Sequence, residues 1–371
     1  MRLPVGKVWC RLLACAALCV IAAQASGQMA KPVASAEKAM PPAAELRRLY
    51  AGLPASWPRP QLKQGAHFAE FAPLPALPAS DAKDRALAAI GKRLFDDPAL
   101  SGSGQIACSS CHSAELGLGD GLRTAYGDKR QRGRRNAISL YTAAWMTPLF
   151  WDGRSDSLQE QALHPIMDRK EMAGDARTVV ARIGEDAGYR AAFAAIDGPR
   201  ALAIADIARA LAAYEQTLAP PRSRWNTVLV KGGGALDDEE RMGLHLFRTK
   251  AGCVSCHNGP LLSDGRFHNL GISYYGRNLQ DLGRYEVTGD AADVGRFRTA
   301  PLLGIGRTAP YMHNGLFPTL EEVVALYNAG GGKDRTARSG DAPPPTHDPL
   351  LAPLGLTPQE HAALVAFLKV L

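Results

Sequence analysis

The chain has 371 residues, of which 46% are hydrophobic and 21% charged, so it can bury a sizeable core and is long enough for two ordinary domains. The formal net charge is +7, but no nucleic-acid-binding module is recognisable, so nucleic acid is excluded as the expected partner. A mild basic excess instead favours an acidic protein partner.

The first 27 residues have the pattern of a secretory signal peptide. Arg2, Lys7 and Arg11 form a positive region, the apolar run LLACAALCVIAA follows, and AQASGQ supplies small residues for cleavage. The apolar run is too short to span a membrane as a helix. A lipoprotein signal ending at Cys15 is the less favoured alternative, because this cysteine lies inside the apolar run. We therefore expect a periplasmic protein that is not membrane-spanning.

Residues 28–83 are rich in alanine and proline, which predicts an extended arm lying over the surface. Two similar units follow, and we expect them at residues 84–228 and 229–371. Each opens with a helical stretch containing G-x-x-L-F, at Gly91–Phe95 and Gly243–Phe247, shortly before a C-x-x-C-H motif. This repetition indicates two domains of one architecture.

Helical patterns dominate both units. Apolar residues recur at three- and four-residue spacing in ADIARALAAYEQTL, and the sequences PPRSRW and KGGGALDDEE mark a domain boundary near residues 220 to 236. Thr319 with Glu322 and Thr357 with Glu360 form capping boxes that open the last two helices. No segment alternates convincingly like a strand. The fold is therefore expected to be mainly α, with long loops.

Cysteine usage is the sharpest signal in the chain. Three of the seven cysteines lie in the signal peptide, and the other four form two C-x-x-C pairs, each followed directly by histidine. C-x-x-C-H is the attachment signal for c-type haem, in which two thioethers hold the porphyrin and the histidine binds iron. The predicted haem-binding residues are Cys108, Cys111, His112, Cys253, Cys256 and His257.

Two other uses of these cysteines fit the sequence less well. A Cys₄ zinc site leaves both histidines unexplained. A thioredoxin-like redox pair requires a βαβ pattern, which surrounds neither motif. Two covalently attached haem c groups are therefore the favoured interpretation.

From about Leu87 to the C-terminus, the chain resembles the bacterial dihaem cytochrome c peroxidases and their relative MauG, which forms tryptophylquinone. The resemblance is carried by both haem motifs together with GRRNA, FWDGR, FRTAP, APYMHNG and LEEVV. It implies two cytochrome c-like domains, each with one haem c. It also implies oxidoreductase activity on hydrogen peroxide, with electrons from a small cytochrome c or cupredoxin.

The resemblance implies that the first haem, at His112, is the peroxidatic one. Typical dihaem peroxidases block its distal face with a histidine until the enzyme is half-reduced. Here that position falls on Asp128, and no histidine occurs between His112 and Asn136. A carboxylate is a poor substitute for imidazole on haem iron, so we expect a permanently open, five-coordinate first haem, as in MauG-like members.

The resemblance also places the catalytic side chains. Glu171 would relay a proton between the peroxide oxygens, Gln161 would orient them, and Trp151 would lie between the two haems as an electron relay. His164 lies in the same segment; a partly buried packing histidine is favoured over an assisting base.

Two residues are candidates for the sixth ligand of the second haem. Tyr327 occupies the position of the methionine ligand of the peroxidases, as in MauG, and shares one helix face with Leu320 and Val324. Met312 is the rival, because thioether is a common partner of histidine in cytochromes c. Tyr327 is favoured.

A calcium ion between the domains is a further implication of the resemblance. The Asn136 side chain and the carbonyls of Thr299 and Pro301 would bind it, with waters completing the shell. The basic run Lys129–Arg135 is expected to be a solvated loop, with pairing to haem propionates as the alternative.

Three functions follow from these observations. The leading one is an exported dihaem peroxidase. The first alternative is a MauG-like oxidase that modifies a side chain of a partner protein, supported by Asp128 and Tyr327. The second is a dihaem electron carrier without catalysis, which fits poorly with a first haem that lacks a distal histidine.

Overall fold

The computed structural model describes residues 40–371, so the expected signal peptide lies outside the described residues. As predicted, the fold is mainly helical, with long irregular loops. Strands in the described part amount to one short antiparallel pair, β1 (Phe267–His268) and β2 (Phe297–Arg298). None of the helices from residue 40 onward has the length and apolar character needed to cross a membrane.

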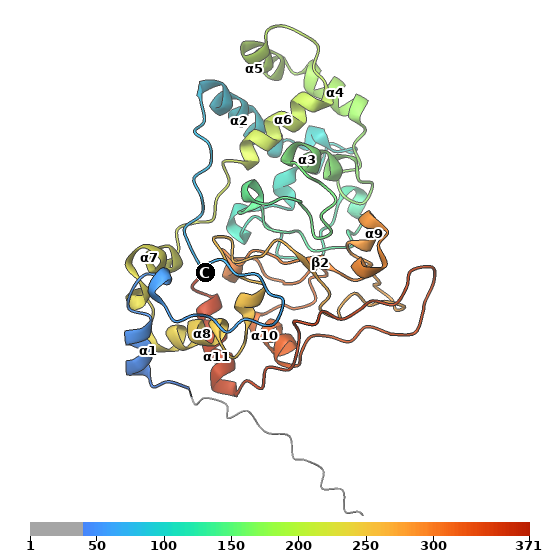
Figure 1. Cartoon of the computed structure of the whole chain (residues 1–371). Coiled ribbons are helices and arrows are strands. Elements are labelled where there is room, and N and C mark those ends of the chain that lie inside the picture. Colours follow the sequence, from blue (N-terminus) through green and yellow to red (C-terminus); the bar gives the residue numbers. More distant parts are fainter. Residues whose placement is uncertain (1–39) are drawn as a thin grey trace, which may run out of the picture. The chain divides into compact units, whose positions relative to one another are not determined.

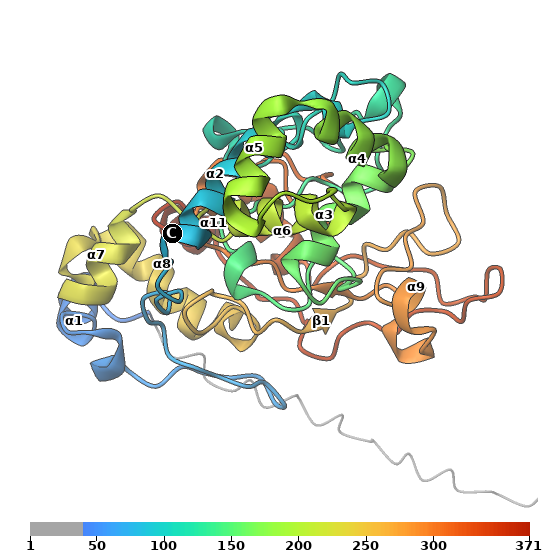
Figure 2. The same ribbon diagram turned by 90° about the horizontal axis from the view of Figure 1, so that it is seen from above.

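The helices gather into two groups around separate cores. In the first group, α2 packs along α6, while α3 and α4 cover further sides of α6 and α5 packs against α2 (Figure 1). Figure 2 shows α3 to α6, in green, lying apart from α1 and α7. The helices of this group are α2 (Ala82–Phe95), α3 (Leu158–Met167), α4 (Ala176–Glu185), α5 (Ala187–Asp197) and α6 (Ile204–Glu215).

In the second group, α8 packs along α11, which also contacts α10, while α1 lies on α8. The predicted starts of α10 and α11 are confirmed: Thr319 accepts a hydrogen bond from the backbone of Glu322, and Thr357 and Glu360 form a complete capping box. The helices that follow the first group in the chain, together with the preceding α1, are α1 (Ala43–Leu49), α7 (Arg224–Lys231), α8 (Asp238–Arg248), α9 (Tyr285–Thr288), α10 (Leu320–Asn328) and α11 (Pro358–Leu368).

The glycine of each repeated G-x-x-L-F stretch lies at a close crossing of two helices. A Cβ at Gly91 of α2 would overlap the backbone carbonyl of Ala210 in α6. A Cβ at Gly243 of α8 would overlap the carbonyl of Ala363 in α11 in the same way. Each glycine therefore lets two helices cross backbone to backbone, which supports the inference of two domains built alike.

The segment before α2 is more than the surface arm that was expected. It contains the helix α1, which was not predicted, and three of its aromatic side chains, Tyr50, Trp57 and Phe71, are buried. Trp57 and Phe71 pack edge-on or tilted against Trp225 of α7, and Phe71 also contacts Phe247 of α8. The segment is thus part of the core of the second group, although it precedes the first group in the chain.

The connection between the two groups lies slightly earlier than expected. A boundary after residue 228 falls inside α7, and Trp225 of α7 packs on Phe367 of α11. The whole of α7 therefore belongs with the second group. The chain crosses between the groups at residues 219–223, where the structure is irregular.

The glycine crossings generate a stability prediction. Gly91→Ala and Gly243→Ala should each lower the free energy of unfolding by about 1–3 kcal/mol, because the added methyl group forces the helices apart. The measurement is thermal or denaturant unfolding of the holoprotein. Gly184→Ala in α4 is the matched control: a Cβ there meets nothing within 4 Å, so the substitution should be neutral or stabilising. Equal effects at all three positions would contradict the close crossings.

Candidate active site

The two C-x-x-C-H motifs adopt the same local conformation. Cys108–Ser110 and Cys253–Ser255 form single 3₁₀ turns, and the backbone N–H of the following histidine bonds back to the first cysteine in both. Nδ1 of His112 lies 2.8 Å from the carbonyl oxygen of Leu118, and Nδ1 of His257 lies 2.9 Å from that of Leu262. A carbonyl can only accept, so Nδ1 carries the proton and Nε2 keeps its lone pair for a metal.

The cysteines are suited to haem attachment and to neither alternative. None of the four forms a disulfide, and burial raises the pKa of the Cys111 thiol to about 11 and that of Cys253 to about 12. A redox-active pair needs the opposite, a lowered pKa. The two pairs also line two different cavities, so they do not converge on one zinc ion.

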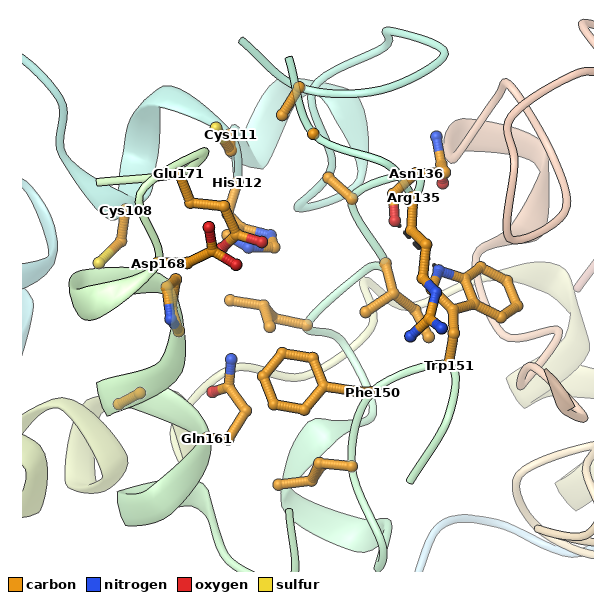
Figure 3. Close-up of a pocket in the computed structure, with 18 of the residues that line it drawn as sticks. Cys108, Cys111, His112, Arg135, Asn136, Phe150, Trp151, Gln161, Asp168 and Glu171 are labelled. Carbon is orange, nitrogen blue, oxygen red and sulfur yellow. Dashed lines mark hydrogen bonds between the residues drawn. The ribbon is translucent and has the colours of Figure 1, made fainter. Parts of the chain in front are cut away.

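The first cavity has a volume of about 790 Å³, within the usual range of about 300–1,000 Å³ for cofactor and ligand sites. Its wall brings Cys108, Cys111 and His112 together with Gln161 and Glu171, as expected from the sequence. Figure 3 shows Glu171, Asp168 and Gln161 on the same side as His112, with Phe150 between them and Trp151. Two thiols and a free imidazole nitrogen on a cavity of this size fit a covalently attached haem.

Glu171 and Gln161 have the properties expected of groups that act on a bound oxygen species. Burial, and secondarily the Asp168 carboxylate, raises the pKa of Glu171. The side-chain oxygen of Gln161 is buried and has no hydrogen-bond partner among the described residues. Asp168, Arg169 and Lys170, which also line the cavity, are exposed, so this edge gives access from solvent.

Asp128 does not replace the distal histidine of typical dihaem peroxidases. It is 3% exposed and does not line the first cavity. Its carboxylate instead accepts a hydrogen bond from the Ser103 hydroxyl. Among the residues that line the cavity, His112 is the one histidine.

The structure reveals a second repeat that the sequence analysis missed. Residues 147–165 and 309–327 can be aligned without a gap, although most of the paired residues differ. Both segments fold as a bridged turn followed by a helix. Leu149 bridges Ser155 in the first copy, and Tyr311 bridges Phe317 at the same positions of the second. The caps of the two helices, Ser157 and Thr319, also coincide.

With this repeat, the two cavities can be compared residue by residue. Met312 corresponds to Phe150, and both adopt left-handed backbone angles, with φ of 70° and 69°. Tyr327 corresponds to Pro165 in α3. Phe150 and Pro165 both line the first cavity, but neither side chain can bind iron. The two positions that hold candidate iron ligands in the second domain therefore hold residues that cannot bind iron in the first domain.

Two backbone hydrogen bonds join the domains, and the residues that form them occupy corresponding positions in the register of the repeat. The backbone N–H of Asn136 donates to the carbonyl of His313 (2.8 Å), and that of Arg298, at the corresponding position, donates to the carbonyl of Trp151 (2.9 Å). Trp151 lines both cavities, and its indole N–H donates to the carbonyl of Asn136 at 3.0 Å. Its ring meets that of His313 edge-on, with centroids 6.4 Å apart.

A buried ion cluster reinforces the same junction. Arg135 makes ion pairs with Asp152, Asp281 and Glu286, and Arg134 pairs with Glu286 and Asp281. Arg135 lowers the pKa of Asp281 to about 2, against the effect of burial. Both arginines line the first cavity; Arg135 is largely buried, whereas Arg134 is exposed, as are Lys129, Arg130 and Arg132 of the same basic run.

His164 is a packing histidine, as favoured. Its ring lies edge-on against Phe150, with centroids 5.3 Å apart, and it is not among the residues that line the first cavity. Its Nε2 lies 4.0 Å from a Glu160 carboxylate oxygen.

The second cavity contains both candidates for the sixth ligand. Tyr327 and Met312 line it together with Cys253, Cys256 and His257. Leu320 and Val324 are buried on the same face of α10, as the sequence predicted. Burial raises the pKa of Tyr327, so the phenol is neutral unless a cation such as ferric iron lies beside it.

The expected calcium ligands also meet at this cavity. Asn136, Thr299 and Pro301 all line it. The Asn136 amide N–H₂ donates to the carbonyl of Leu122 at 3.0 Å, which leaves its side-chain oxygen for another partner. The carbonyl of Thr299 accepts a bond of 2.7 Å from the Ser263 hydroxyl.

The sequence analysis missed Glu215, which lines the first cavity from the end of α6. It is 4% exposed, one of its oxygens has no hydrogen-bond partner, and burial raises its pKa to about 8. Burial therefore favours the protonated form of this carboxyl. A signal was available: Glu215 follows the buried Leu211 and Ala212 by one turn, on the apolar face of the helix.

Cys256, Asp264 and His268 form a group with metal-binding residue types, with ligand atoms within 4.8 Å of one another. Both ring nitrogens of His268 are already bonded, to Asp348 at 2.6 Å and to Asp264 at 2.9 Å. Although burial opposes it, these carboxylates raise the pKa of His268 to about 12. A protonated imidazole has no lone pair for a metal, so this cluster is a buried ion pair beside the second cavity.

The choice between the two ligand candidates can be tested directly. If Tyr327 is the sixth ligand, Tyr327→Phe should change the low-spin absorption spectrum of the holoprotein, because it would remove the phenol oxygen from the second haem. Met312→Leu, which conserves volume, should leave that spectrum unchanged. The reverse result would assign the sixth position to Met312.

Comparison with known proteins gives a consistent family match. A family model described as di-haem cytochrome c peroxidase matches residues 85–233, and one described as RoxA-like, cytochrome c-like, matches residues 297–327. The cytochrome-c peroxidase IdrP1 of Pseudomonas sp. (strain SCT) is 35% identical over 332 residues, covering 81% of this chain and 85% of that protein. The methylamine utilization protein MauG of Methylorubrum extorquens is 33% identical over 286 residues, covering 76% and 77%.

The solved structures agree. The crystal structure of a MauG-like protein associated with microbial copper homeostasis matches with a TM-score of 0.69 and 30% identity, covering 84% of this chain and 95% of that one. Together with the family models, this confirms the predicted fold of two cytochrome c-like domains.

Proposed function

Because this chain belongs to the dihaem cytochrome c peroxidase and MauG family, we propose that it reduces hydrogen peroxide to water with electrons from a small redox protein. The observation that carries this proposal is the wall of the first cavity. This wall contains a haem-attachment motif together with Glu171 and Gln161. It also contains Phe150 and Pro165, which correspond to the two candidate iron ligands of the second domain, Met312 and Tyr327. A position without a protein ligand, beside one carboxyl that can relay a proton and one amide that can orient the substrate, supports peroxide chemistry.

Haem iron, when bound at His112, would supply the site where peroxide is activated and its oxidising equivalents are held. Glu171 would take the proton from one peroxide oxygen and return it to the other, so that water leaves. The unpartnered oxygen of Gln161 would accept a hydrogen bond from the peroxide and fix its orientation without titrating. The exposed edge at Lys170 would admit the substrate.

Trp151 would pass electrons between the domains. It lines both cavities, its carbonyl accepts the backbone N–H of Arg298 across the junction, and its indole N–H is held by the Asn136 carbonyl within its own domain. The donor that reduces the second haem would be a small cytochrome c or a cupredoxin. A signal peptide over residues 1–27 would export the protein to the periplasm, where c-type haem is attached.

The calcium ion remains part of this proposal. The side-chain oxygen of Asn136 and the carbonyls of Thr299 and Pro301 would hold it at the junction of the two domains. Hard oxygen ligands of this kind suit Ca²⁺. Because Asn136 also bonds Trp151 and His313 through its backbone, the ion would stabilise the relay position.

A MauG-like oxidase that modifies a partner protein is the second candidate. Tyr327 at the second cavity favours it, because a tyrosinate ligand lowers the potential of haem and suits it to storing oxidising equivalents. A dihaem electron carrier is the third candidate. It requires protein ligands on both faces of both irons, which Phe150 and Pro165 do not supply.

The role of Glu171 predicts a defect that depends on pH. Glu171→Gln should slow the peroxide-induced change of the haem spectrum by about a hundredfold or more. In the unmodified protein the rate should rise with pH through a pKa above the usual glutamate value, because burial raises this pKa and the ionised form is the base. Stopped-flow measurements from pH 4 to 8 check both points. An unchanged rate and pH profile in Glu171→Gln would remove Glu171 from the mechanism.

Turnover distinguishes the candidates. Steady-state peroxide reduction with reduced cytochrome c should be fast for a peroxidase. Rapid reaction with peroxide that leaves such donors unoxidised would support the MauG-like oxidase. A protein that reacts with peroxide in neither the oxidised nor the half-reduced form would leave only the electron carrier.

A further inference from the structure

Residues 168–174, which carry Glu171, form a tight turn directly after α3. Asp168 caps this turn, because its backbone carbonyl accepts hydrogen bonds from the N–H groups of Glu171 (3.0 Å) and Ala173 (2.8 Å). Ala173 adopts a left-handed φ of 51°. The turn has no regular secondary structure of its own. Backbone bonds from Met172 to Pro165 and from Gly174 to Ile166 tie its end to α3, so the position of the part around Glu171 also depends on the loops that pack against it.

One side of the turn is held by the loop 127–131. The backbone N–H of Asp128 donates to the carbonyl of Glu171 at 2.6 Å. A Cβ at Gly127 would overlap the backbone carbonyls of Lys170 and Glu171, so the loop lies flat against the turn. No side chain other than hydrogen fits at that point.

The other side of the turn is held by the loop that precedes the first haem motif. The backbone N–H of Gly102 donates to the carbonyl of Met172 at 2.8 Å, and a Cβ at Gly102 would overlap the carbonyl of Ala173. This loop is fixed from behind by Arg182 of α4, which donates to the carbonyl of Gly102 at 3.1 Å.

Asp128 joins the two sides. Its carboxylate accepts a hydrogen bond from the hydroxyl of Ser103, the residue after Gly102. The two loops and the turn therefore form a closed ring around the backbone of Glu171. Lys129 and Arg130 both adopt left-handed backbone angles, with φ of 50° and 59°. Two such non-glycine residues in succession are costly and persist only where surrounding contacts hold them.

We propose that this ring is a clamp that positions the Glu171 carboxyl over the first cavity, and that Asp128 is its positioning residue. The inference rests on the proposed function of Glu171. It assigns a new role to the position at which typical dihaem peroxidases carry their distal histidine: here the loop holds the proton relay in place instead of blocking the iron. The clamp closes through protein contacts alone, without a haem ligand.

The test uses the holoprotein and four variants. Asp128→Ala removes the link to Ser103, and we expect it to slow the peroxide-induced spectral change by about tenfold, the usual worth of a hydrogen bond to a charged group. Asp128→Asn keeps an acceptor oxygen and should retain most of the rate. Ser103→Ala removes the same bond from the other side and should reproduce the defect. Asp186→Ala, at the cap of α5 and away from the clamp, is the matched control and should keep the normal rate.

Two readouts separate positioning from general damage. Hydrogen exchange of residues 168–174 should rise in Asp128→Ala and Ser103→Ala but stay unchanged in Asp128→Asn and Asp186→Ala. In a Glu171→Gln background, Asp128→Ala should cause little further loss of rate, because it acts through Glu171. If the Asp128→Ala variant does not mature with haem, the hydrogen-exchange and rate measurements are made on Ser103→Ala instead.

Unchanged hydrogen exchange at residues 168–174 in both Asp128→Ala and Ser103→Ala would overturn the clamp. So would independent, multiplying rate losses from Asp128→Ala and Glu171→Gln. If Glu171→Gln alone leaves the rate unchanged, the proposed function of Glu171 fails, and the exchange measurement still decides whether the clamp exists.

Discussion

The number of protein ligands that each haem iron can have is the constraint on which the two-domain arrangement depends. The two domains present one turn-and-helix frame twice, and in that frame two positions face the cofactor. The second domain fills them with Met312 and Tyr327, either of which can bind iron, whereas the first has Phe150 and Pro165, which cannot. One backbone frame thus offers possible iron ligands in the second domain and none at the same positions of the first, and only the side chains distinguish the two.

In the proposed function, the junction between the domains lets each domain carry a different step. Reciprocal backbone bonds, from Asn136 to His313 and from Arg298 to Trp151, fix the two frames against each other. They place the indole of Trp151 at the wall of both cavities. Arg135 and its buried carboxylate partners secure the contact. Peroxide chemistry and electron entry can then occupy separate domains while remaining joined by one side chain.

The sequence predicted best what depends on local spacing. The haem motifs, the caps at Thr319 and Thr357, and the inward face of Tyr327 are all set by residues a few positions apart. The gapless resemblance pointed to Glu171, which lines the first cavity, and its role stays a prediction. The buried role of Trp57 was not predictable, because its partners come from α7 and other distant segments. Asp128 was noticed for the histidine it replaces, but its bond to Ser103 depends on how two loops meet in space.

The most direct test of this account is the electron paramagnetic resonance spectrum of the fully oxidised holoprotein, quantified per haem. An open first haem and a six-coordinate second haem should give one high-spin and one low-spin ferric signal in equal amounts. Two low-spin signals, with no high-spin iron as isolated, would mean that a protein side chain occupies the distal face at His112. That result would contradict the role assigned to Phe150 and Pro165.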